Sequence, residues 1–225
     1  MRYLFFTMLI MSTFSLSAQN AQKKFALYYV GDPMCSWCYG ITNEWQALVG
    51  YYPEAEVHYI MGGLRPNGAE AMAALKDFLQ EHWEEVHLRT GMPFKLDILE
   101  RDMVYNTEPA CRAVVTFRHF NAEKTRDFFK KVQHAFYVEN HNPYLASNYA
   151  ALAEELGVNR EDFLSYFLSP SASQKTIADF EKARSLGASG FPTILAEVDG
   201  TLFVVSRGYQ TATSMHAYMQ KLLGK

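Results

Sequence analysis

The 225-residue chain has few cysteines, and that scarcity excludes whole classes of protein. Three cysteines are too few for a disulfide-stapled scaffold, and too few for a zinc module built from two CxxC pairs. A chain of this length can also bury a full apolar core, so it needs no such staples. Two of the three cysteines, Cys35 and Cys38, nevertheless stand three positions apart.

Charge of one sign and long apolar runs are also scarce. The formal net charge is −3, and lysine and arginine form no long runs, so nothing indicates a nucleic-acid partner. Charged residues make up 20% and apolar residues 49% of the chain, which is an ordinary globular balance rather than a disordered one. The apolar stretch at residues 3–11 is well short of the roughly 20 residues that span a bilayer.

Residues 1–18 are predicted to be a signal peptide. Arg2 supplies a positive start, residues 3–11 an apolar segment, and residues 15–18 the small side chains of a cleavage site. An uncleaved anchor is the alternative. No cysteine lies at the end of the apolar segment, which argues against lipidation. Export implies an oxidising compartment, the periplasm in a bacterium, with no stable membrane insertion after cleavage. The first strand begins soon after this site and leaves no room for a dimerisation domain, so we expect a monomer.

The start of the mature chain reads as a β-α-β unit. Residues 25–30 are apolar without alternation, which is typical of a strand buried on both faces. A helical spacing follows over residues 41–52 and ends at Pro53, and residues 57–61 alternate as a second strand does. A right-handed crossover makes the two strands parallel.

The remainder divides into a helical block and a closing hairpin. Asp199-Gly200 separates two β-favouring runs, 192–198 and 201–206, which predicts a hairpin, and a last helix opens at Thr211 or Thr213. Gly157 and Gly187 are predicted to end helices, and Asn159 to start one. No strand is predicted between the two sheet regions; the helix-like segments there are 69–90, 107–120, 123–139, 144–156, 160–168 and 173–186.

The two paired cysteines lie where a strand gives way to a helix. Unpaired N–H groups and roughly half a positive charge at a helix N-terminus favour a thiolate. Cys35 is nearest that end and is the predicted nucleophile, whereas Cys38, one turn on, would form a disulfide with it and resolve mixed disulfides. The alternative is that the CxxC is half of a zinc site, which His58 and His82 would complete. A purely structural disulfide would close too small a loop to stabilise the protein much.

Four motifs carry a resemblance to a known family. They are the run from Asp32 to Gly40 around the CxxC, Gly-Gly-Leu at 62–64, Asn-Thr-Glu-Pro-Ala-Cys-Arg-Ala at 106–113, and Gly-Phe-Pro-Thr at 190–193. The chain resembles the thioredoxin superfamily, its DsbA branch and, most closely, the FrnE-like DsbA subfamily. The resemblance implies an α/β thioredoxin-like fold: residues 19–64 form its first half, 65–187 a large all-helical insertion, and 188–225 its second half.

The resemblance also implies roles for individual residues. Pro192 would be a cis proline beside the cysteines, and the backbone of Phe191 would pair with an extended substrate. Many thioredoxins and DsbA proteins carry a buried acid six residues before the first cysteine. This chain has Tyr29 there, which leaves the proton acceptor for Cys38 unassigned.

Other residues near the motif have two interpretations each. Asp32 could exchange protons with the site or tune Cys35, or it could simply be a turn residue ahead of Pro33. Ser36 and Trp37 lie between the cysteines, and Trp37 would shield the disulfide or contact substrate. Cys111 is either a small buried hydrophobe or an auxiliary thiol near the site.

These patterns together predict an exported thiol–disulfide oxidoreductase that acts on protein thiols and exchanges electrons with an unidentified redox partner. It would use Cys35 and Cys38 without a cofactor or metal. Whether it oxidises, reduces or isomerises stays open. One alternative is a glutathione-linked transferase or isomerase of the same architecture, with Arg65 or Arg112 binding an anionic substrate; a CxxC metal-binding module is the other.

Overall fold

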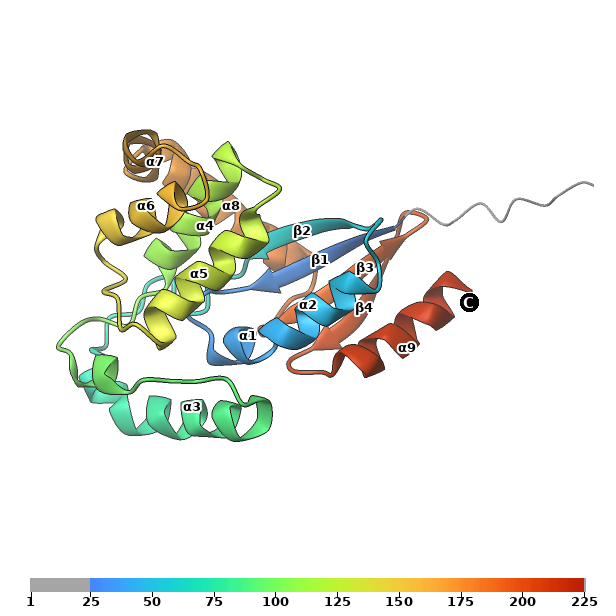
Figure 1. Ribbon diagram of the computed structural model, residues 1–225, viewed down its shortest axis with the longest axis horizontal. Helices are drawn as coiled ribbons and strands as arrows, with labels where there is room; N and C mark the ends of the chain where they lie inside the picture. The colour runs from blue at the N-terminus through green and yellow to red at the C-terminus, as the bar shows by residue number, and fades with distance from the viewer. Residues whose placement is uncertain (1–24, 225) are drawn as a thin grey trace, which may run out of the picture.

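A four-stranded mixed sheet forms the centre of the fold (Figure 1). The computed structural model describes residues 25–224, so the predicted signal peptide lies outside the described residues. The strands lie in the order β2-β1-β3-β4, and their bounds are β1 Phe25–Gly31, β2 Glu56–Met61, β3 Thr193–Val198 and β4 Thr201–Arg207. The predicted parallel pairing of β1 with β2 is confirmed, and the β3–β4 hairpin turns at Asp199 and Gly200, both with positive φ.

Helices cover both faces of this sheet (Figure 1). Val30, Ile60 and Leu195 point to one face and pack against Ala183 of helix α8 (Pro170–Ser185). The opposite face carries Leu27 and neighbouring buried side chains, and belongs to the larger core. Around that core lie α1 (Ser36–Gly40), α2 (Thr42–Gly50) and α9 (Ala212–Leu223).

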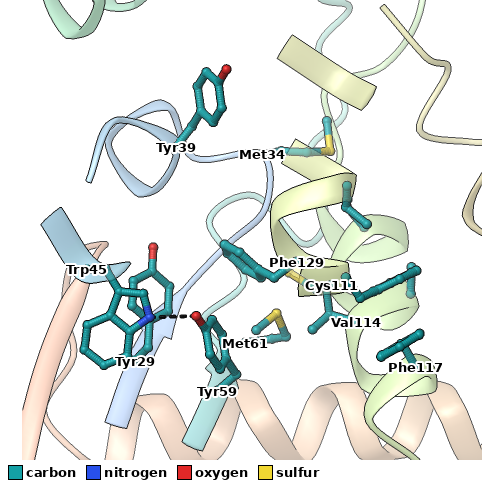
Figure 2. Packing of buried hydrophobic residues seen from close by; sticks show 14 of the residues in the cluster. Tyr29, Met34, Tyr39, Trp45, Tyr59, Met61, Cys111, Val114, Phe117 and Phe129 are labelled. Carbon is teal, nitrogen blue, oxygen red and sulfur yellow. Dashed lines mark hydrogen bonds between the residues drawn. The ribbon is translucent and has the colours of Figure 1, made fainter. Parts of the chain in front are cut away.

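The predicted helical insertion is present between β2 and β3. Its remaining elements are α3 (Lys76–Thr90), α4 (Glu108–Phe120), α5 (Thr125–Tyr137), α6 (Ala146–Glu154), α7 (Arg160–Phe167) and the short 3₁₀ helices η1 (Ala73–Leu75) and η2 (Asp97–Glu100). Helix α4 turns Cys111, Val114 and Phe117 into the core, a spacing of three and three that places them on one helical face (Figure 2). The insertion and the sheet therefore share one continuous apolar core.

Aromatic rings join β1 and β2 to the helices. Tyr29 lies 5.2 Å from Trp45 and 5.1 Å from Tyr59, centroid to centroid, and 5.5 Å from Phe129 of α5. The Trp45 Nε1–H donates to the Tyr59 hydroxyl at 2.6 Å, so the polar tips of both rings are satisfied inside the core (Figure 2).

The prediction of a helix over residues 69–90 is wrong at its start. Ala71 bridges Val104 in antiparallel fashion, the Met72 N–H donates to the Met103 carbonyl, and helix α3 begins only at Lys76. The prediction that the insertion holds no strand is confirmed for the described residues between β2 and β3, where Ala71 and Val104 make only an isolated bridge. The pairing partner lies more than thirty residues away, so local apolar spacing carries no sign of it.

Other helix boundaries follow their capping residues. The predicted helix over 41–52 is α2, which begins at Thr42 and ends at Gly50; the short helix α1 comes before it, and Ile41 separates the two. Helix α8 starts earlier than predicted because Ser169 caps it, accepting from the Ala172 N–H at 3.3 Å, with Pro170 in the first turn. Asn159 and Thr211 cap their helices as predicted. Across residues 25–224, no helix combines the length and apolar character needed to cross a membrane.

Candidate active site

The two cysteines of the CxxC motif lie at the start of α1, directly after β1. Cys35 is the N-cap residue of α1, and its N–H donates to the Asp32 carbonyl at 3.1 Å, which closes the turn from strand to helix. The Cys38 side chain, one turn on, is fully buried and hydrogen-bonds with Cys35. Both are free thiols in this structure, as is Cys111. The two sulfurs are thus neighbours, with Cys38 behind Cys35.

Burial controls the protonation of Cys38. It raises the pKa of the Cys38 thiol well above its ordinary value, and the adjacent Cys35 raises it further, whereas the Asp32 N–H donates to the Cys38 sulfur and lowers the pKa. Tyr29, at the position where many relatives carry an acid, donates its hydroxyl proton to the Cys38 carbonyl at 3.1 Å. Burial raises the pKa of Tyr29 as well, so Tyr29 is a neutral donor and no base for Cys38.

The Gly-Phe-Pro-Thr segment lies against Cys35. The Phe191–Pro192 peptide bond is cis, as the resemblance implies, and Pro192 is buried. The Cys35 Sγ lies 3.6 Å from the Phe191 carbonyl oxygen, to which it donates. The Phe191 ring packs so closely on Gly62 that a Cβ at that glycine would lie 2.1 Å from the ring. Three segments far apart in sequence, those of Cys35, Gly62 and Phe191, therefore lie together at this point.

A cavity of about 350 Å³ opens beside Cys35. The sequence placed Ser36, Trp37 and Phe191 near the cysteines, and all three line this cavity. Sequence reasoning missed most of the other wall residues, which come from η1, α3 and two loops: Leu64, Leu75, Phe78, Leu79, His82, Trp83 and Tyr105, beside Arg65. The amphipathic pattern of α3 was visible, but nothing local indicated that its apolar face meets the CxxC loop.

Asp32 is buried rather than exposed in a turn. Its backbone does form the turn, as one of the two interpretations predicts, while its fully buried carboxylate accepts hydrogen bonds from Met34, Leu64, Thr107 and Cys111. Burial raises the pKa of Asp32, and the four hydrogen bonds act in the opposite direction. Thr107 was also missed as a site residue. It stands just before α4, and its hydroxyl donates to Asp32 at 2.6 Å instead of capping that helix.

Cys111 fits both of its predicted descriptions in part. It is fully buried in the apolar core (Figure 2), and its Sγ donates to the Asp32 carboxylate at 3.3 Å. Burial raises the pKa of Cys111, and the nearby negative charge of Asp32 adds to the effect. A thiol in that state is a poor nucleophile in the folded protein.

The two arginines considered for an anionic substrate lie in different surroundings. Arg65 borders the cavity and pairs with Glu70, whereas Arg112 pairs with Glu108 and lies over the Phe167 ring at 4.5 Å. Within residues 25–224, no group of three or more histidine, cysteine or acidic side chains is arranged to hold a metal ion.

Comparison with known proteins agrees with this geometry. Residues 27–218 match the profile of the DSBA-like thioredoxin domain. A solved structure from Nitrosomonas europaea, assigned as a protein disulfide isomerase, is 31% identical, with 89% of this chain and 98% of that one covered and a TM-score of 0.81. The cytosolic disulfide reductase DsbM from Pseudomonas aeruginosa is 26% identical, with 88% and 98% covered and a TM-score of 0.74.

A Streptomyces coelicolor protein assigned as a DsbA oxidoreductase shares the fold at 16% identity, with 89% and 91% of the two chains covered and a TM-score of 0.70. A search of the curated proteins finds no match. The family profile covers most of the chain and the fold agrees throughout, so the protein belongs to the DsbA-like thioredoxin family of disulfide oxidoreductases.

Proposed function

We propose that this protein is an exported thiol–disulfide oxidoreductase that exchanges disulfides with protein thiols through Cys35 and Cys38. The observation that carries the proposal is the arrangement of the two sulfurs. Cys35 lines a cavity that opens to solvent, while Cys38 is fully buried directly behind it. The Cys35 sulfur is therefore placed to react with a substrate, and the Cys38 sulfur is placed to react only with Cys35.

The arrangement supports a two-step exchange. In the oxidised protein, a substrate thiolate attacks the Cys35 sulfur, the Cys35–Cys38 bond breaks, and Cys38 leaves with the electron pair and takes up a proton. A second substrate thiolate then attacks the sulfur joined to Cys35, which forms the substrate disulfide and releases the reduced protein. The reverse sequence starts from the Cys35 thiolate, and Cys38 resolves the mixed disulfide.

The cavity supports a polypeptide as the substrate. Its wall is mostly apolar, and two of its side chains, Leu64 and Phe78, are 41% and 56% exposed. An extended chain has apolar side chains to cover them, which glutathione lacks. The second thiol, Cys38, also favours dithiol exchange over the glutathione-linked alternative.

A Cys38→Ser variant tests the proposal. We expect this variant, when it is given a peptide in disulfide form, to form a stable mixed disulfide between Cys35 and the peptide. The reason is that no Cys38 thiol remains to release the peptide. Mass spectrometry of the non-reduced protein would show one peptide per chain, lost on adding dithiothreitol. An adduct on Cys111, or adducts with oxidised glutathione but none with peptides, would contradict the proposal.

Export is the second part of the proposal and rests on the pattern of residues 1–18. We expect the protein recovered from a bacterial host to lack these residues and to appear in the periplasmic fraction. N-terminal sequencing of the purified protein measures this directly. A chain that begins at Met1 in the cytosolic fraction would overturn the export proposal and leave the exchange chemistry untouched.

A further inference from the structure

A buried carboxylate beside the two cysteines has no part in the exchange steps described above. The Asp32 Oδ1 accepts from the Met34 N–H at 2.8 Å. The Oδ2 accepts from the Leu64 N–H at 2.7 Å, from the Thr107 hydroxyl at 2.6 Å and from the Cys111 thiol at 3.3 Å. None of these four donors is basic. The carboxylate is therefore held by neutral dipoles, and its negative charge is not cancelled by an ion pair.

Asp32 also contacts both cysteines of the motif through its backbone. Its carbonyl accepts from the Cys35 N–H at 3.1 Å, and its N–H donates to the Cys38 sulfur. All three cysteines of the chain thus contact one residue. A charge so close to the thiols, in a buried environment of low dielectric constant, acts strongly on any thiolate formed there.

The other ionisable groups around the carboxylate do not offset this charge. Tyr105, Tyr137 and Tyr149 are buried, which raises the pKa of each, so all three are neutral at pH 7. Arg65 lies over the Tyr105 ring at 5.5 Å, but its guanidinium pairs with Glu70. Glu108 of α4 adds a further negative influence on Cys111. Of the charged groups named here, Asp32 is the one that contacts the cysteines of the CxxC motif.

We propose that the carboxylate of Asp32 makes the Cys35–Cys38 pair a stronger reductant by disfavouring the thiolate that appears when their disulfide is reduced. This inference rests on the proposed exchange function and supplies the direction that the function leaves open. In the equilibrium with glutathione, two glutathione thiols pass two electrons to the protein disulfide, giving oxidised glutathione, the Cys35 thiolate, the Cys38 thiol and one proton released to solvent. A negative charge beside the nascent thiolate moves this equilibrium back toward the protein disulfide.

The matched pair of variants is Asp32→Asn and Asp179→Asn. Asp179 is also a partly buried carboxylate that accepts from a backbone N–H, that of Met61 at the end of β2, at 2.9 Å, but it pairs with Arg118 at 2.8 Å and contacts none of the cysteines. At pH 7, we expect Asp32→Asn to raise the equilibrium constant for reduction by glutathione about tenfold, equivalent to about 30 mV for two electrons. Asp179→Asn should lower the melting temperature and leave that constant unchanged.

A second readout separates charge from packing. Without the carboxylate, the thiolate should form at lower pH, so the rate of alkylation by iodoacetamide should rise at lower pH than in the natural protein. Asp32→Ser is the second neutral variant, and we expect the same two shifts from it.

One result would overturn the inference and assign Asp32 a structural role. In that case a folded neutral variant, either one, would have a lower melting temperature but an unchanged equilibrium constant and alkylation profile. A fall in the equilibrium constant would also overturn it. The exchange function stands or falls separately, because it is measured by the trapped adduct of Cys38→Ser.

Discussion

Replacing Cys35 with serine is expected to abolish disulfide exchange, with a loss of more than about a thousandfold in rate. The Cys35 sulfur is the one that lines the cavity, and the other two thiols are fully buried. A serine hydroxyl is almost fully protonated near neutral pH and cannot form the mixed disulfide. The measurement is the rate of reduction or oxidation of a cysteine-containing peptide, followed by chromatography under non-reducing conditions.

Cys111→Ser is the control for this variant. The serine hydroxyl can still donate to Asp32, and the Cys111 sulfur lies off the exchange path, so exchange should be retained. Circular dichroism would verify that both variants are folded. Exchange by Cys35→Ser at a rate close to that of the natural protein would refute the assignment of Cys35 as the nucleophile.

The second large effect is expected from Gly62→Ala. A Cβ at position 62 would lie 2.1 and 2.2 Å from two atoms of the Phe191 ring, far inside van der Waals contact. The ring must move away from the loop, and this movement displaces the Phe191 carbonyl that contacts the Cys35 sulfur. We expect a loss of about a hundredfold in peptide exchange, the scale set by misplacing a reacting group by about 1 Å. Overpacking should also cost about 1–3 kcal/mol of stability.

Gly50→Ala is the matched control. Gly50 lies at the end of α2, is exposed, and has no atom within 4 Å of an added Cβ. The free energy of unfolding of the Gly50→Ala variant should change by no more than about 1 kcal/mol, and its exchange rate should stay the same. Thermal denaturation and the peptide assay, run on both variants, compare the two glycines directly. Equal exchange rates in the two variants would show that Phe191 can move without consequence for Cys35.

Local signals in the chain predicted most of the fold and the centre of the site. The apolar run of β1, the Asp199-Gly200 turn and the placement of Cys35 and Cys38 after a strand are all short-range patterns. Each depends on a few consecutive residues whose conformational preferences do not need a distant partner. The resemblance supplied the cis bond before Pro192, which local chemistry alone would not have favoured.

The errors and omissions have a different origin. The helix expected from residue 69 gives way to a bridge with Val104, and the α3 wall of the cavity was not foreseen. Both depend on contacts between segments that are far apart in sequence. Periodicity reports which face of a helix is apolar, but not which element that face will cover.

The sequence by itself determined that a pair of cysteines opens a helix in a thioredoxin-like chain, because turn, strand and helix signals there are local. Only the tertiary structure decided the surroundings of that pair. It buried Cys38, brought Phe191 to the Cys35 sulfur, and enclosed the carboxylate of Asp32 with Thr107 and Cys111. The physical reason is that burial and long-range hydrogen bonds, which govern the charge and reactivity of a thiol, exist only when the distant segments have packed together.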